Sequence, residues 1–250
     1  MRRAALIVSA ALAAAAAAMA ACRSNPLEAA PDRSRSEQPT PQHPVAPVSA
    51  PSLCVTKGSA SLGGTIEEPT VRAVALGSSG EAASLSFVFR GDTAAARELA
   101  SGETRRQLGL KLRAQDGCNL LYVMWRLDPR PAVTVSLKLN PGKRTHHECG
   151  AGGYTRLKPV RAAVPSLVPV PALSAGASHT LRAEIVHDDL LAWIDDQLVW
   201  RGPLPASARD LSGPAGLRSD NVSFDLVSLD AAPASAASPS SAKCPADPGD

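Results

Sequence analysis

The stretch 107–140 constrains the fold of this chain more than any other. Residues 108–112 alternate leucine with small or basic residues, and residues 133–139 alternate valine or leucine with polar residues. A period of two is typical of a β-strand with one buried face. Between these segments, Asp116-Gly117 favours a two-residue hairpin turn, because a type I′ turn needs positive φ at both central positions. The stretch therefore predicts three consecutive antiparallel strands.

The predicted turn also predicts how the first two strands pair. Leu112 lies opposite Leu121, and Leu108 lies opposite Trp125, so one face is apolar. The other face is mostly polar, and it carries Lys111, Arg113, Tyr122, Arg126, Ser136 and Lys138. A sheet with one apolar and one polar face is expected in an antiparallel β-sandwich.

The rest of the folded region has the same character. Short alternating segments recur at 84–90, 181–186 and 222–226, with turn residues between them. Pro69 favours an edge position for the strand around it, because proline cannot donate to a β-ladder. About nine strands in a region of this length predict an all-β fold, a two-sheet antiparallel jelly-roll sandwich. We place this domain at 53–231.

The first 22 residues predict export. A basic start, Met1-Arg2-Arg3, precedes an alanine-rich apolar segment that ends in Met19-Ala20-Ala21-Cys22. This ending resembles the bacterial lipobox, which implies a lipoprotein signal peptide at 1–22 and lipidation of Cys22. An ordinary secretory signal with a nearby cysteine is the alternative.

Proline-rich and serine-rich segments flank the domain. Residues 23–52 predict a disordered linker behind the lipid anchor, and residues 232–250 predict a Ser/Pro/Ala tail. No other segment is apolar for long enough to cross a bilayer, so the anchor would be the only membrane attachment. The location expected is the cell envelope. Arg23, rather than an aspartate, follows the lipidated cysteine and favours the outer membrane.

Charge argues against one class of partner. The chain has 26 basic residues, and removing Arg2 and Arg3 leaves 24 against 23 acidic residues, a net charge of +1. Nucleic-acid binding normally requires a large basic excess, so no nucleic-acid partner is expected.

Four cysteines remain after Cys22. An even number in an exported chain suggests two disulfides, which three connectivities would allow. We favour Cys118–Cys149 and Cys54–Cys244, the second of which would join the two ends of the folded region. Zinc ligation is a weaker alternative because the sequence has no Cys-x-x-Cys spacing.

A family resemblance is carried by three segments, 179–184 (HTLRAE), 191–200 (LAWIDDQLVW) and 213–221 (GPAGLRSDN). Together they resemble the C-terminal half of a concanavalin A-like or laminin G-like jelly roll. Asp196 stands where that family usually has glycine. The resemblance implies the sandwich fold, but the superfamily includes lectins, adhesion modules and glycosidases, so it names no single activity.

The resemblance directs attention to the polar face of the sheet. In this superfamily the concave face often holds the ligand, so Lys111, Tyr122, Arg126 and Lys138 are candidates for gripping an acidic sugar or a carboxylate. The alternative is a solvated face with scattered charges.

A second candidate is the pair Trp193 and Trp200. A two-residue turn between their strands would put both indoles on one side of the sheet, where they could stack on a sugar. A bulge or a longer turn would separate them.

Asp220 and Asn221 are the candidate metal ligands. Their side-chain oxygens suit calcium, which laminin modules and lectins of the superfamily bind in loops. Aspartate and asparagine are also ordinary turn residues, so this signal is weak. Apart from possible calcium, no cofactor is expected.

No catalytic motif is evident in the sequence. Concanavalin-like glycosidases carry two carboxylates on one strand, but Glu184 is followed by residues that do not fit that spacing. The main hypothesis is a non-catalytic envelope lipoprotein whose sandwich binds a glycan or an envelope protein. The alternatives are a glycoside-active enzyme with an unrecognised carboxylate pair and a purely structural envelope module.

Overall fold

The computed structural model describes residues 53–160, 168–234 and 244. The predicted signal peptide at 1–22, with Cys22, and the predicted linker at 23–52 lie outside the described residues, as does most of the predicted tail. No helix in the described part of the chain is both long enough and apolar enough to span a membrane.

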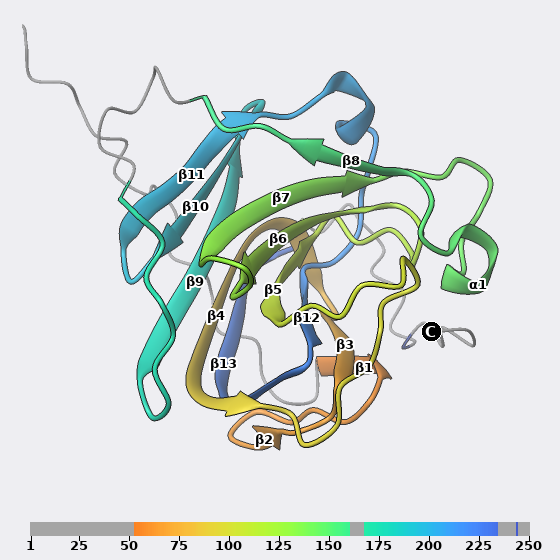
Figure 1. Cartoon of the computed structure of the whole chain (residues 1–250). Coiled ribbons are helices and arrows are strands. Elements are labelled where there is room, and N and C mark those ends of the chain that lie inside the picture. The colour runs from red at the N-terminus through yellow and green to blue at the C-terminus, as the bar shows by residue number, and fades with distance from the viewer. Residues whose placement is uncertain (1–52, 161–167, 235–243, 245–250) are drawn as a thin grey trace, which may run out of the picture. The chain divides into compact units, whose positions relative to one another are not determined.

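The described residues form a sandwich of two antiparallel sheets (Figure 1), as the sequence predicts. In order, the seven-stranded sheet consists of β1 (Leu53–Lys57), β3 (Thr70–Ala75), β12 (Gly216–Asp220), β5 (Gln107–Leu112), β6 (Leu120–Arg126), β7 (Ala132–Lys138) and β8 (Tyr154–Leu157). The six-stranded sheet consists of β11 (Gln197–Pro203), β10 (Asp189–Ile194), β9 (Ser178–Val186), β4 (Ser78–Asp92), β13 (Val222–Pro233) and β2 (Thr65–Ile66). Two short helices, α1 (His146–Cys149) and η2 (Ala206–Ala208), lie in connections.

The core lies between the two sheets and is built by alternation along the strands. Leu108, Leu110 and Leu112 of β5 are fully buried on the inner face, as is Trp125 of β6. Phe87 of β4 meets the Trp125 ring edge-on, with 6.0 Å between ring centroids. Large apolar side chains from both sheets therefore interdigitate and fix the spacing of the sandwich.

The register predicted for β5 and β6 is confirmed, but the turn between them is not the predicted one. Leu112 pairs with Leu121 and Leu108 with Trp125. The connection is a longer loop, because the Asp116 carboxylate accepts hydrogen bonds from the Cys118 amide and the Asn119 side chain. This arrangement is an Asx-type loop rather than a type I′ turn.

The altered loop changes the position of Arg113. This residue has a positive φ of 46°. Its guanidinium donates to the Glu81 carboxylate and to the Ala208 carbonyl oxygen. The prediction that Arg113 shares the polar face of the sheet is therefore wrong.

The segment 216–233 contributes one strand to each sheet, β12 and β13, and the alternating pattern at 222–226 predicted only the second of them. Asn221, with a positive φ of 56°, connects β12 in one sheet to β13 in the other. The Asn221 amide donates to the Pro69 carbonyl oxygen, 2.9 Å away. Pro69 lies between β2, which is an edge strand of the six-stranded sheet, and β3, which is flanked by β1 and β12, so the predicted edge position is correct for β2 and wrong for β3.

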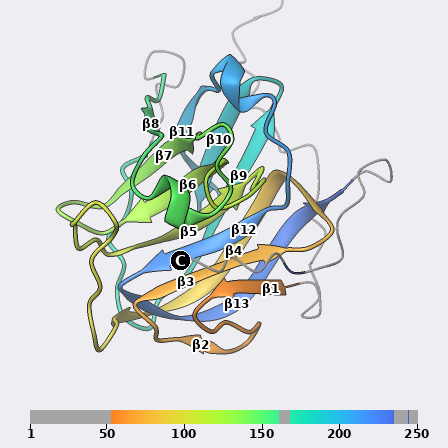
Figure 2. The same cartoon turned by 90° about the vertical axis from the view of Figure 1, so that its right-hand side faces the viewer.

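Two disulfides join the pairs that the sequence favours. Cys118–Cys149 ties the loop after β5 to α1, and Cys54–Cys244 ties β1 to the C-terminal segment. Strand β1 is an edge of the seven-stranded sheet, and its pairing with β3 is irregular between Val55 and Lys57. Figure 2 shows β1 beside β3 at this edge.

Candidate functional site

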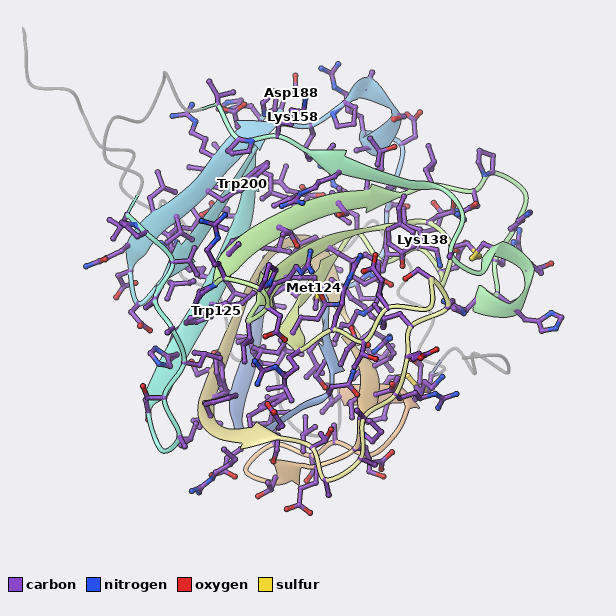
Figure 3. All side chains as sticks on the ribbon, viewed as in Figure 1. Met124, Trp125, Lys138, Lys158, Asp188 and Trp200 are labelled. Carbon is purple, nitrogen blue, oxygen red and sulfur yellow. A yellow bond between two sulfur atoms is a disulfide. The ribbon has the colours of Figure 1, made fainter. Side chains whose placement is uncertain are left out.

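The outer face of the seven-stranded sheet carries the polar side chains that the sequence predicts. Lys111 pairs with Tyr122, and Tyr122 pairs with Ser136 on the next strand, so these side chains share one face. Met124 and Trp125, both labelled in Figure 3, are consecutive in β6 and lie on opposite faces of the sheet. This face is not broadly exposed, since Tyr122 is only 5% accessible and Lys138 is 0% accessible.

A buried ionic group occupies the β3–β12–β5 part of this outer face. The Asp220 carboxylate accepts hydrogen bonds from Arg72 and Arg218, each at 2.8 Å, and from the Gln107 side chain at 2.6 Å. Burial by itself would raise the pKa of Asp220. The charges of Arg72 and Arg218 and the hydrogen bonds outweigh it, so the pKa lies well below its ordinary value. The carboxylate therefore stays ionised and holds both guanidinium groups in place.

These contacts disfavour the calcium site predicted at Asp220 and Asn221. Both Asp220 oxygens accept from cationic or amide donors, so a calcium ion would lie beside two guanidinium groups. The Asn221 side chain accepts a hydrogen bond from the Arg97 amide and donates to the carbonyl oxygens of Arg97 and Arg105. In this structure Asn221 fixes the 93–106 loop, and Asp220 is the anion of a buried ion pair.

Two tyrosines stack beside this ionic group. The rings of Tyr122 and Tyr154 are nearly parallel, with 6.0 Å between centroids. The Arg218 guanidinium lies 4.9 Å from the centroid of the Tyr122 ring. Tyr122 is buried, whereas Tyr154 is 41% accessible, so the pair presents one aromatic surface to solvent. Burial raises the pKa of the Tyr122 hydroxyl, and the group stays neutral at physiological pH.

A pocket of about 290 Å³ opens on this face next to the tyrosines. Its lining comes from the 93–106 loop, from β5 to β8, from β12, and from α1 and the α1–β8 connection. The lining residues are Leu99, Ala100, Ser101, Arg105, Gln107, Tyr122, Met124, Arg126, Thr134, Ser136, His146, Gly150, Ala151, Tyr154, Arg156 and Arg218. An aromatic surface with hydroxyl groups and fixed cations around it is suited to a polar organic ligand.

The predicted ligand-binding residues divide into three groups. Tyr122 and Arg126 line the pocket. Lys111 and Lys138 lie on the same outer face but not in the pocket lining, and Lys138 Nζ donates to the Gly117 carbonyl oxygen at 2.9 Å. Trp193 and Trp200 belong to the other sheet. The structure therefore brings together two of the six.

The prediction that Trp193 and Trp200 share one side is wrong. The two-residue turn between their strands is present, since Ile194 pairs with Gln197, but the register shifts between Ala192 and Trp193. Trp200, labelled in Figure 3, consequently points into the core and is 3% accessible. Trp193 lies on the outer side beneath Arg182, whose guanidinium carbon is 3.9 Å from the indole centroid. The two indoles cannot form one platform.

Sequence reasoning missed several lining residues. Tyr154 and Arg156 alternate in β8, and nothing in the sequence shows that this strand borders the sheet beside β7. The loop carrying Leu99 and Arg105 reaches the pocket through its bonds to Asn221, which the sequence does not reveal.

The wall formed by α1 is held covalently. Thr145 and Glu148 form a capping box at its start, in which Glu148 Oε2 accepts from the Arg144 and Thr145 amides. These backbone hydrogen bonds lower the pKa of Glu148 to about 2. The Cys118–Cys149 disulfide anchors the helix to the loop after β5. The His146 side of the pocket is thereby positioned by the disulfide and the cap together.

The pocket has no pair of carboxylates of the kind that glycosidases use. None of its lining residues, all of which are described, is an aspartate or a glutamate. Within the described residues no cluster of three or more histidine, cysteine, aspartate or glutamate side chains could hold a metal ion. The arrangement can bind and orient a polar ligand.

Comparisons with known proteins add structural likeness only. No protein-family model matches the sequence, and no curated protein matches it. Among solved structures, the carbohydrate-binding module CBM66 from Bacillus subtilis aligns with a TM-score of 0.45 and 13% identity, covering 72% of this chain and 96% of that one. A tetrameric galectin from the ball sponge Cinachyrella sp. aligns with a TM-score of 0.37 and 15% identity, covering 67% and 97%.

A glycoside-hydrolase structure is also similar. The GH43 protein BlXynB from Bacillus licheniformis aligns with a TM-score of 0.36 and 12% identity, covering 65% of this chain and 29% of that one. At these identities and TM-scores the likeness does not transfer a ligand or an activity to this chain. The site has to be interpreted from its own geometry.

Proposed function

We propose that this chain is a non-catalytic, carbohydrate-binding protein of the bacterial cell envelope, and that the pocket on the outer face of its seven-stranded sheet holds the glycan. The observation that carries the proposal is the half-exposed ring of Tyr154, stacked on buried Tyr122 at one wall of the pocket. Sugars present apolar C–H faces that pack on aromatic rings, while their hydroxyls need hydrogen-bond partners around the ring.

The pocket supplies those partners in fixed positions. Thr134 and Ser136 project from β7, and Gln107 projects from β5 into the same lining. The Gln107 amide is held by its 2.6 Å hydrogen bond to Asp220. Groups held by a rigid sheet lose little conformational freedom on binding, which favours affinity for a small polar ligand.

A glycan-array screen of the full chain, purified in detergent and run with and without calcium, tests the proposal. We expect specific binding that does not depend on calcium. Tyr154→Ala should weaken it by about tenfold or more, a loss of about 1.4 kcal/mol, whereas Tyr154→Phe, which keeps the ring, should bind nearly as well as the original chain. Trp193→Ala is the control on the other sheet and should leave binding unchanged. Silence across the array would refute sugar binding and favour an envelope protein partner or a structural role.

The lipid anchor is a separate part of the proposal, and it is supported by the sequence signature around Cys22. Acylation of the purified chain would appear as added mass on the peptide that begins at Cys22. Cys22→Ser should abolish that mass and release the protein from membranes. An unmodified Cys22 in the original chain would refute the anchor without affecting the pocket.

A further inference from the structure

The charge of the pocket is unusually one-sided. Four arginines and one histidine contribute to its lining, and no acidic side chain does. The four arginines come from separate elements: Arg105 from the 93–106 loop, Arg126 from the end of β6, Arg156 from β8 and Arg218 from β12. The fold therefore gathers cations from distant parts of the sequence around one cavity, although the chain as a whole is near charge balance.

Two of these arginines are neutralised within the protein. Arg218 pairs with the buried carboxylate of Asp220, and Arg105 pairs with Glu103. Neither Arg126 nor Arg156 forms an ion pair with any carboxylate in the described parts of the chain. Two positive charges at the pocket consequently have no internal counter-charge among the described residues.

One nitrogen atom of Arg126 is buried without a hydrogen-bond partner. Its Nε atom is buried, and within the described structure it donates to no acceptor. A buried donor without a partner is costly, and such atoms are uncommon in folded proteins. The hydrogen bonds of the Arg126 guanidinium are therefore incomplete within the described structure.

The surroundings of Arg126 destabilise the charged form of its guanidinium. Burial lowers the pKa of its guanidinium, and the positive charges of Arg105 and Arg156 lower it further. Glu103 and Asp128 oppose this effect only in part, and each is already engaged by another arginine, Arg105 and Arg106 respectively. The field at Arg126 is thus positive, and an anion would relieve it.

We propose that the glycan bound in this pocket is acidic, and that its anionic substituent sits against the guanidinium groups of Arg126 and Arg156. Guanidinium groups bind carboxylate and sulfate oxygens in two-pronged hydrogen bonds, which gives strength and orientation together. The sugar ring packs on Tyr154, which lies two residues before Arg156 in β8. This inference rests on the proposed function, because it names the class of ligand for the same pocket.

The test compares glycans that differ only in charge. Uronic-acid oligosaccharides, the same oligosaccharides after chemical reduction of their carboxyl groups, and sulfated oligosaccharides are titrated against the full chain by calorimetry. We expect the uronates or the sulfated sugars to bind at least about tenfold more tightly than the neutral forms, and this preference should fade as salt is raised. The carboxylate and sulfate arms identify which substituent the pocket takes.

Variants assign the preference to the two arginines. Arg156 is exposed, so Arg156→Gln should leave the fold intact. The variant should bind the acidic sugar about tenfold more weakly and should change the affinity for the neutral sugar by less than about twofold. Arg126→Gln should do the same. Arg209→Gln is the matched control, because Arg209 is exposed, pairs with Asp188 and does not line the pocket; it should leave binding unchanged.

The outcomes separate the two proposals. Equal binding of acidic and neutral forms, lost in Tyr154→Ala, would overturn the acidic ligand and leave sugar binding intact. A charge preference that survives in both arginine variants would overturn the assignment to Arg126 and Arg156. Failure of every oligosaccharide to bind would overturn both proposals.

Discussion

Replacing Asp220 by asparagine is the perturbation whose outcome the structure determines most sharply. The side chain is fully buried, and it is the carboxylate that Arg72 and Arg218 share, each at 2.8 Å. An asparagine keeps the shape but removes the charge, which leaves two buried cations without their anion. Breaking a buried ion pair by removing one partner costs about 3–5 kcal/mol.

The loss of the Asp220 charge should affect Arg218 more than Arg72. Arg72 retains hydrogen bonds to the carbonyl oxygens of Val71 and Ser219, both at 3.0 Å. Arg218 retains only a long 3.4 Å contact with the Tyr154 hydroxyl and the face of the Tyr122 ring. We therefore expect Asp220→Asn to disturb the tyrosine pair, and with it the pocket, as well as to lower stability.

Urea unfolding at neutral pH with the disulfides intact, followed by tryptophan fluorescence, measures the free energy of unfolding. Asp225→Asn is the matched control, because Asp225 also pairs with an arginine, Arg90, but at the surface. That variant should change stability little. If Asp220→Asn lost less than about 1 kcal/mol, the value for an exposed pair, the assignment of a buried, stabilising ion group would be refuted.

Two further predictions follow from the same contacts. The pKa of Asp220 is lower in the folded chain than its ordinary value of 3.8, so its stabilising contribution should be complete above about pH 5 and lost as the pH falls below about 4. The free energy of unfolding should therefore decrease less steeply with falling pH in Asp220→Asn than in the original chain. An equal decrease in both proteins would contradict this. Trp200→Ala removes a core indole and should cost about 3–5 kcal/mol in urea unfolding. Trp193→Ala, on the outer side beneath Arg182, should cost clearly less, and equal losses would contradict the placement of the two indoles.

The sequence predicts the sandwich well because its leucines and valines alternate strictly. The register of β5 against β6 follows from the pattern, since a shift by one residue would turn every leucine to the outside. This argument holds even though the turn itself is different, because the buried face and not the loop decides the pairing. Both favoured disulfides are present, and the expectation that the two ends of the folded region are joined is confirmed by Cys54–Cys244.

The site is less predictable because it depends on irregular features. A one-residue shift between Ala192 and Trp193 sends Trp200 into the core, and periodicity cannot reveal such a bulge. The same holds for Asn221, which looks like a turn residue or a calcium ligand but carries the chain from one sheet to the other. The strand order β12-β5-β6-β7-β8 brings the cations of the pocket together, and no local sequence pattern predicts that order.

The irregular pairing of β1 and its disulfide have a consequence for how copies of this protein meet. A domain carried on a lipid anchor, as we propose, meets other copies at high density in the plane of the membrane. An open sheet edge can then pair with a strand of another copy and extend the sheet from one molecule to the next. The shift between Val55 and Lys57 interrupts the regular row of donors and acceptors that such growth requires, and Cys244 is bonded to the same strand at Cys54. Sheet extension between neighbouring molecules is thus disfavoured at β1, the strand with which the domain begins.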